Sequence, residues 1–213
     1  MITGLSAGQE YNQLLVAPDH MRNRYIDFIE REIDNAKANK PARIIAKMNA
    51  LEDRMITEAL YRASNAGVKI DLIVRGFCCL RPGVKGMSAN ITVRSIIGRF
   101  LEHSRVFVFA NGSDNPQEYT YYFGSADWMY RNLSARVEAA CPVHSPEAKA
   151  RLWRMLDVML QDRRKASVLN PDGSYTQLTA APTDDPTSPA VLGTFETLMR
   201  DALPPTDENR ANA

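Results

Sequence analysis

The sequence of 213 residues is poor in cysteine, with only Cys78, Cys79 and Cys141. An odd count with two adjacent members is not a disulfide framework, because neighbouring cysteines can bond only through a strained small ring. Cys141 and His144 could supply two zinc ligands, but a structural zinc site needs four in paired spacings, which this sequence does not offer. We therefore expect small buried thiols in a reducing compartment and no metal site.

The sequence also lacks a surplus of either charge and lacks long apolar runs. Lys+Arg 26 against Asp+Glu 25 leaves a formal net charge of +1, so a domain held to nucleic acid by bulk charge is not indicated. No apolar stretch approaches the roughly 20 residues that cross a bilayer, and residues 1–10 lack the features of a secretory signal. We expect a cytoplasmic chain with no transmembrane segment and no nucleic-acid partner, and leave peripheral membrane association open.

Hydrophobic periodicity predicts alternating strands and helices in the first third of the chain. The apolar run 14–17, stopped by Pro18, indicates a buried strand, and residues 19–38 carry the apolar stripe of a helix with Asp19 as N-cap. Runs 42–48 and 70–74 predict two further strands, and between them a helix covers 51–63 and closes at Gly67. This order predicts an α/β fold with a mixed, largely parallel sheet flanked by helices.

The remainder is rich in strands and ends in a proline-rich tail. Strands are predicted at 91–97, 105–110, 119–123 and 137–140, a helix from Ser145 to about Lys165, and a hairpin around residues 171–173. Six of the 12 prolines lie between Pro171 and Pro205. We divide the chain into a remnant of a preceding domain or linker (1–13), a main domain (14–165), a hairpin extension (166–179) and a tail (180–213) with a short helix at 191–203.

Among the three histidines, His103 is the candidate for chemistry. His20 and His144 lie at predicted helix starts, where surface residues are expected. His103 precedes an apolar strand and lies two positions before Arg105, which places both on one face. Two positive groups repel at close range, so the pair indicates an anion that joins them. From this pair alone, an active-site role and a structural role both stay open.

A second feature is the strand end at Gly124, Ser125 and Asp127. A strand that runs into Gly-Ser and then a helical turn presents backbone N–H groups and a hydroxyl, which can cradle phosphate oxygens. By itself such a turn is weak evidence. Preceded by His103-x-Arg105 at the distance of one strand and loop, it is a stronger indication of a phosphate site.

Together these residues resemble the half-site of the phospholipase D superfamily, His-x-Lys followed by Gly-Ser-x-Asn, with Arg105 in place of Lys and Asp127 in place of Asn. The surrounding sequence resembles the C-terminal catalytic domain of the bacterial polyphosphate kinases that make long-chain polyphosphate. The stretches that carry this resemblance are 47–51, 73–76, 99–106, 125–132 and 171–175. It implies a phospholipase D-like domain.

The resemblance further implies a kinase that moves the γ-phosphate of ATP reversibly onto polyphosphate through a phosphohistidine. It implies His103 as the catalytic histidine that faces the phosphorylated one, and Arg75 as a contact of the nucleotide phosphates. Arg75 also ends a predicted strand, where α/β sheets bind ligands. Because both side chains are positively charged, Arg105 and Arg136 are further candidates to bind ATP or phosphate.

Alternatives remain for several of these residues. For Arg75 the alternative is a structural salt bridge, and for Arg136 a plain surface arginine. Lys47, at another strand end, could approach phosphate, but we expect a solvated lysine.

The chain departs from the family in one respect. The phosphorylated histidine and the arginines that contact Mg²⁺ lie upstream in the family, in a domain that this sequence lacks. We therefore expect the last domain of a longer enzyme, inactive alone, with Mg²⁺ needed by the intact enzyme but held elsewhere. Expected partners are ATP, ADP, polyphosphate, the N-terminal domains and further copies of the same chain. A phosphodiester transferase and a non-catalytic dimerisation or docking domain stay open as alternatives.

Overall fold

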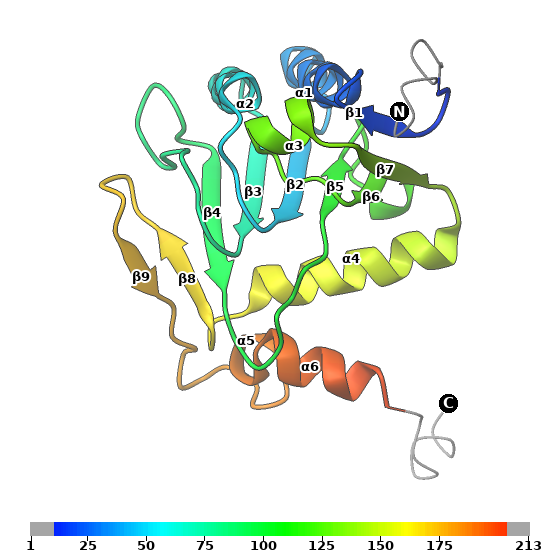
Figure 1. Ribbon diagram of the computed structural model, residues 1–213. Coiled ribbons are helices and arrows are strands. Elements are labelled where there is room, and N and C mark those ends of the chain that lie inside the picture. Colours follow the sequence, from blue (N-terminus) through cyan, green and yellow to red (C-terminus); the bar gives the residue numbers. More distant parts are fainter. Residues whose placement is uncertain (1–10, 204–213) are drawn as a thin grey trace.

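The computed structural model describes residues 11–203, which form one nine-stranded sheet with helices on both faces (Figure 1). The strand order is β1-β7-β6-β5-β2-β3-β4-β8-β9. The strands are β1 (Leu15–Ala17), β2 (Arg43–Met48), β3 (Lys69–Val74), β4 (Ile91–Ile96), β5 (Val106–Phe109), β6 (Thr120–Gly124), β7 (Glu138–Val143), β8 (Ala166–Leu169) and β9 (Tyr175–Gln177). The helices are α1 (Met21–Lys37), α2 (Arg54–Asn65), α3 (Tyr130–Ala135), α4 (Pro146–Gln161), α5 (Pro189–Leu192) and α6 (Thr194–Asp201), with a 3-10 turn at Pro116–Glu118.

The prediction of a mixed α/β sheet flanked by helices is confirmed, but the sheet is not largely parallel. Among the described strands, only β2–β3 and β3–β4 pair in parallel, and the other neighbours pair antiparallel. A parallel pair needs a crossover connection, which α2 supplies between β2 and β3 and a long loop supplies between β3 and β4. From β5 to β7 the chain instead forms an antiparallel meander.

Three local predictions need correction at helix ends. Helix α1 is N-capped by His20 without a side-chain hydrogen bond, so Asp19 is not its cap. Helix α2 begins at Arg54 because the Asp53 carboxylate accepts a hydrogen bond from the backbone N–H of Ile56, at 3.1 Å. The predicted helix 191–203 is two helices, α5 and α6, because Gly193 breaks it with a φ of 77°.

Helices cover both faces of the sheet (Figure 1), and each face carries its own apolar core. One core joins α1 and α2 to the sheet and includes the fully buried Trp128, which stacks on Phe107 with ring centroids 5.0 Å apart. The other joins α4 to the opposite face, and Phe195 of α6 packs against it. The residues described next lie at the edge of the sheet where strands β2 and β3 end.

Candidate functional site

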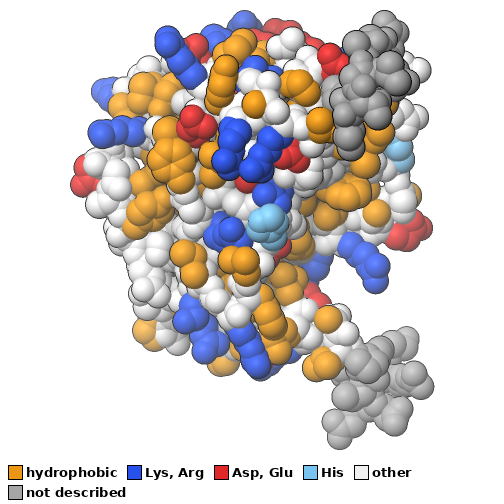
Figure 2. Space-filling view, in the orientation of Figure 1, with side chains coloured by type: hydrophobic (Ala, Val, Ile, Leu, Met, Phe, Trp, Pro, Cys, Tyr) orange, Lys and Arg blue, Asp and Glu red, His pale blue; other side chains and the backbone are white. Residues whose placement is uncertain are grey.

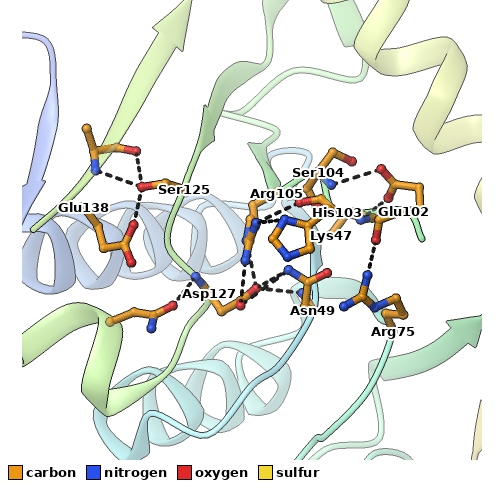
Figure 3. Close-up of polar contacts among 12 residues, drawn as sticks. Lys47, Asn49, Arg75, Glu102, His103, Ser104, Arg105, Ser125, Asp127 and Glu138 are labelled. Atoms are coloured by element: carbon orange, nitrogen blue, oxygen red, sulfur yellow. Dashed lines mark hydrogen bonds and ion pairs between the residues drawn. The ribbon is translucent and has the colours of Figure 1, made fainter. Parts of the chain in front are cut away.

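The topology brings the ends of three strands and one loop to the same edge of the sheet (Figure 3). The carboxyl ends of the parallel strands β2 and β3 lie there. Because β5 is antiparallel to β2, its first residue, Val106, pairs with Lys47, and the loop 97–105 therefore arrives at the same edge. Phe123, near the end of β6, pairs with Val106 as well, which delivers Asp127 to the group. Ligands commonly bind at such an edge.

His103 and Arg105 contact each other directly, whereas the sequence predicts only that they share a face, and both precede strand β5. Nη1 of Arg105 lies 2.7 Å from Nδ1 of His103 and also donates to the His103 carbonyl, at 2.9 Å. Guanidinium nitrogens cannot accept a hydrogen bond, so Nδ1 must be the acceptor. The imidazole proton is therefore on Nε2, and the exposed His103 presents an N–H donor.

The sequence predicts an anion that joins this pair, but the carboxylate found there belongs to the protein itself and binds Arg105, not His103. Nε and Nη2 of Arg105 each donate to one carboxylate oxygen of Asp127, both at 3.1 Å, in a bidentate ion pair. Asp127 is buried and also accepts from the backbone N–H of Asn49 at 2.7 Å and from its side-chain amide at 3.2 Å. Arg105 thus does not require a bound anion, and its charge is balanced within the fold (Figure 3).

Lys47 is not the solvated lysine that we expected, because only 2% of the residue is exposed. Its amino group donates to the Ser104 carbonyl at 2.6 Å and forms an ion pair with the Glu102 carboxylate. Burial lowers the pKa of Lys47, although Glu102 opposes this shift. Burial alone would raise the pKa of Glu102, but hydrogen bonds from Lys47 and Ser104 bring it below its ordinary value.

Arg75 is the cation of the group that is left without a carboxylate partner among the described residues. Its Nη1 donates to the backbone carbonyl of Glu102 at 2.7 Å, and its own carbonyl accepts from the Ser95 hydroxyl at 2.7 Å. The structural salt bridge considered as an alternative is thus not formed within residues 11–203. Figure 2 shows Lys and Arg side chains gathered around a histidine near the middle of one face.

The Gly124-Ser125 turn does not form the phosphate cradle that the sequence suggests. The backbone N–H of Ser125 donates to the Ala139 carbonyl at 3.0 Å, and its hydroxyl contacts the Glu138 carboxylate. A Cβ on residue 124 would lie 2.5 Å from the Ala139 carbonyl oxygen, so glycine is needed for strand β7 to approach. The turn is therefore a β6–β7 packing element whose donors are already used.

The remaining candidates lie apart from this group. Arg136 is exposed at the end of α3, and its side chain makes no hydrogen bond or ion pair with any residue in 11–203. Nε2 of His20 lies 3.2 Å from the Leu14 carbonyl oxygen, and His144 is exposed after β7.

The described residues do not fit a metal ion. Within 11–203, no three His, Cys, Asp or Glu side chains lie close enough together to hold one. Near His103 the carboxylates of Glu102 and Asp127 are each bound to a cation, Lys47 and Arg105 respectively.

Of the described helices, none is long and apolar enough to cross a membrane.

Comparison with known proteins shows the family of this chain. Residues 14–188 match the model of the family described as polyphosphate kinase C-terminal domain 2. The chain belongs to this family. Polyphosphate kinase of Thermosynechococcus vestitus is 52% identical over 203 residues, which are 95% of this chain and 26% of that protein. Polyphosphate kinase of Pseudomonas aeruginosa is 46% identical over 87% of this chain and 26% of that protein.

The crystal structure of polyphosphate kinase from Porphyromonas gingivalis is similar to this C-terminal domain, with a TM-score of 0.81 and 38% identity over 90% of the chain and 28% of that structure. The chain therefore spans about a quarter of the polyphosphate kinases that it matches. The relatives contain further domains outside the matched part.

Sequence reasoning missed three contacts of this site: the Lys47–Glu102 pair, the Asn49–Asp127 hydrogen bonds and the donation from Arg75 to the Glu102 carbonyl. Lys47 and Asn49 do occur in a stretch that resembles the polyphosphate kinases, and both lie at the end of a strand. Their place at the end of a strand is the feature of the sequence that points to both residues. The partner of each residue comes from a loop distant in sequence, which periodicity cannot locate.

Proposed function

We propose that the chain forms the C-terminal part of an ATP–polyphosphate phosphotransferase, in which His103 contacts the transferred phosphoryl group or its leaving oxygen. The contact of 2.7 Å between Arg105 Nη1 and His103 Nδ1 carries this proposal. It holds the imidazole in the tautomer with a proton on Nε2. An N–H donor of this kind can hydrogen-bond a non-bridging oxygen or supply a proton to a departing one.

The cations divide into two kinds under this proposal. Arg105 binds Asp127 and His103, so it acts mainly by holding the imidazole, with one Nη2 hydrogen left for a phosphate oxygen. Arg75 has no carboxylate partner among the described residues and can offset charge on an ATP or polyphosphate oxygen. Arg136, exposed and without a side-chain partner in 11–203, is proposed as a second phosphate contact.

The further partners are part of the same proposal. The phosphohistidine would be supplied by a domain outside this chain, and so would the ligands of Mg²⁺, whose chemistry is to neutralise phosphate charge. ATP, ADP and polyphosphate are the substrates and products, and the intact enzyme is a homo-oligomer. A cytoplasmic location agrees with ATP as substrate and with the free thiols of Cys78, Cys79 and Cys141.

The test is ATP-dependent polyphosphate synthesis by the full-length enzyme that contains this chain. His103→Gln keeps a polar side chain but removes the imidazole, and we expect turnover to fall by about 100-fold or more, the usual range for loss of a general acid or base. His144→Gln is the matched control, because His144 is exposed and lies outside the group. If His103→Gln and His144→Gln both retained wild-type turnover, the proposal would be wrong.

A second assay tests for the alternative activity, that of a phosphodiester transferase. Bis(p-nitrophenyl) phosphate offers a simple phosphodiester to the same preparations. We expect no release of p-nitrophenol that depends on His103. Release that disappears in His103→Gln, together with unchanged polyphosphate synthesis, would favour a phosphodiester transferase.

A further inference from the structure

Two helices of the proline-rich tail, α5 and α6, lie beside the loop 97–105 that carries His103 (Figure 1). The contact is made by Phe195, near the start of α6. A Cβ on residue 98 would lie 2.2 Å from Cε2 of the Phe195 ring, so the ring rests directly on the backbone of Gly98. The Phe100 ring lies against the same side chain, with centroids 6.0 Å apart.

The loop has few other anchors on this side. It contains no helix or strand, and Ile97 and Leu101 are 68% and 79% exposed. Its second half is held by polar contacts, from Arg75 to the Glu102 carbonyl and from Lys47 to the Ser104 carbonyl. Phe195 is thus the apolar anchor of the first half, and it lines one small pocket together with Arg75 and Glu102.

Helix α6 is itself fixed firmly to the body of the domain. The backbone N–H of Thr194 donates to the Asp162 carboxylate at 2.7 Å, and both residues are fully buried. The other carboxylate oxygen of Asp162 accepts from the backbone N–H groups of Arg164 and Lys165, each at 2.8 Å. A buried carboxylate with three backbone donors is a rigid connection, so Phe195 occupies a defined place beside the loop.

We propose that α5 and α6 are a positioning element for the active-site loop, and that Phe195 is a positioning residue that holds Gly98 and Phe100 so that Glu102 and His103 meet Lys47 and Arg105. The tail is thereby assigned a part in phosphoryl transfer without contact to substrate. This inference rests on the proposed function for its effect on turnover. Its effect on the loop itself does not depend on that function.

Gly98 and Phe195 allow a sharp test because either side of the contact can be changed. Gly98→Ala adds a methyl group where the Phe195 ring lies, so the loop or the ring must move. Phe195→Ala removes the ring and creates room for that methyl group. Phe195→Leu keeps an apolar side chain in the same place. Leu198→Ala is the matched control, since Leu198 lies on the same helix but borders α4 residues such as Arg151 and Met155 instead of the loop.

The first measurement is the ¹⁵N NMR spectrum of the histidine side chains in the 213-residue chain, which has three histidines. In the wild type and in Leu198→Ala we expect His103 to show a protonated Nε2 and an unprotonated Nδ1. In Phe195→Ala and Gly98→Ala we expect the two nitrogen shifts to move toward their average, because the contact with Arg105 is loosened. Restoration by Phe195→Leu is expected. Unchanged His103 shifts in both disruptive variants would overturn the inference.

The second measurement is turnover of the full-length enzyme with the same variants. We expect Phe195→Ala to lower kcat by about 10- to 100-fold, the scale of a misplacement of roughly 1 Å, with Phe195→Leu close to wild type. Gly98→Ala should lower kcat in the wild-type background and have little further effect in Phe195→Ala. A kcat in Phe195→Ala equal to that of Leu198→Ala, or independent effects of Gly98→Ala in both backgrounds, would also overturn it. If His103→Gln left turnover unchanged while Phe195→Ala still moved the His103 shifts, the proposed function would fail and the positioning role would stand.

Discussion

Arg105 binds both carboxylate oxygens of Asp127, each at 3.1 Å, and turns its remaining nitrogen to Nδ1 of His103. One guanidinium therefore connects a buried carboxylate to an exposed imidazole. The consequence for the His-x-Arg motif is specific. Its arginine is neutralised by the aspartate that follows the Gly-Ser turn, so the two halves of the motif are joined by an ion pair.

Removal of the Asp127 charge tests the structural part of this relationship. Asp127→Asn leaves the Arg105 guanidinium partly buried without a full counter-charge, and we expect the free energy of unfolding to fall by about 3 kcal/mol. Asp201→Asn is the control, because Asp201 pairs with Arg154 at an exposed position and should cost less than about 1 kcal/mol. Urea unfolding followed by circular dichroism measures both. Equal losses in the two variants would contradict the description of the Arg105–Asp127 pair.

The Lys47–Glu102 pair predicts a dependence of stability on pH. The folded state lowers the pKa of Glu102 from its usual 4.5, so the folded state favours the carboxylate. Its contribution to stability is therefore fully present above pH 4.5 and is lost as the pH falls through the lower, folded-state value. We expect the difference in unfolding free energy between wild type and Glu102→Gln to narrow over that range.

The control for this prediction is the double variant Lys47→Met, Glu102→Gln. Glu102→Gln alone leaves the Lys47 ammonium buried without its partner, whereas the double variant removes both charges. The double variant should be more stable than Glu102→Gln at neutral pH. A difference between wild type and Glu102→Gln that stayed constant with pH would argue against the ion pair.

The neighbouring cysteines should differ in reactivity. Burial raises the pKa of the Cys78 thiol to about 11, so little thiolate forms at pH values where alkylation is usually measured, while Cys79 is exposed. In a chain with Cys78 as the sole cysteine, alkylation by iodoacetamide should be at least about tenfold slower than in a chain with Cys79 alone. Mass spectrometry over time gives both rates. Equal rates would show that Cys78 is not shielded as the structure has it.

Local patterns were sufficient to predict most of the fold. Strands β2 and β3, the helix between them and the start of a helix at Ser145 follow from periodicity and residue preferences, since each depends on neighbours in sequence. The direction in which the strands pair does not follow from such local patterns. The meander from β5 to β7 lies beside β2 rather than beside β4, and that choice depends on how distant apolar faces pack.

For the candidate site, the sequence predicts His103, Arg75 and Arg105 as functional residues, and this stays a prediction; it does not predict which residues they contact. The sequence predicts an anion that joins His103 and Arg105, but Nδ1 of His103 accepts from Arg105 directly, and the carboxylate that binds Arg105 is Asp127, 22 residues away, which only the fold brings there. The sequence predicts a solvated Lys47 because lysine is seldom buried. The ion pair with Glu102 offsets the free-energy cost of burying the Lys47 charge. This pair requires the loop 97–105 to fold over the end of β2.

Under the proposed function, Arg105 acts in phosphoryl transfer by holding His103. A double-variant cycle with Arg105→Gln and His103→Gln tests it, with kcat for ATP-dependent polyphosphate synthesis by the full-length enzyme as the measurement and circular dichroism to confirm that each variant is folded. Residues that act as one unit give losses that do not multiply. We therefore predict that the double variant is within about twofold of the slower single variant. Losses that multiply in the double variant would contradict this role of Arg105.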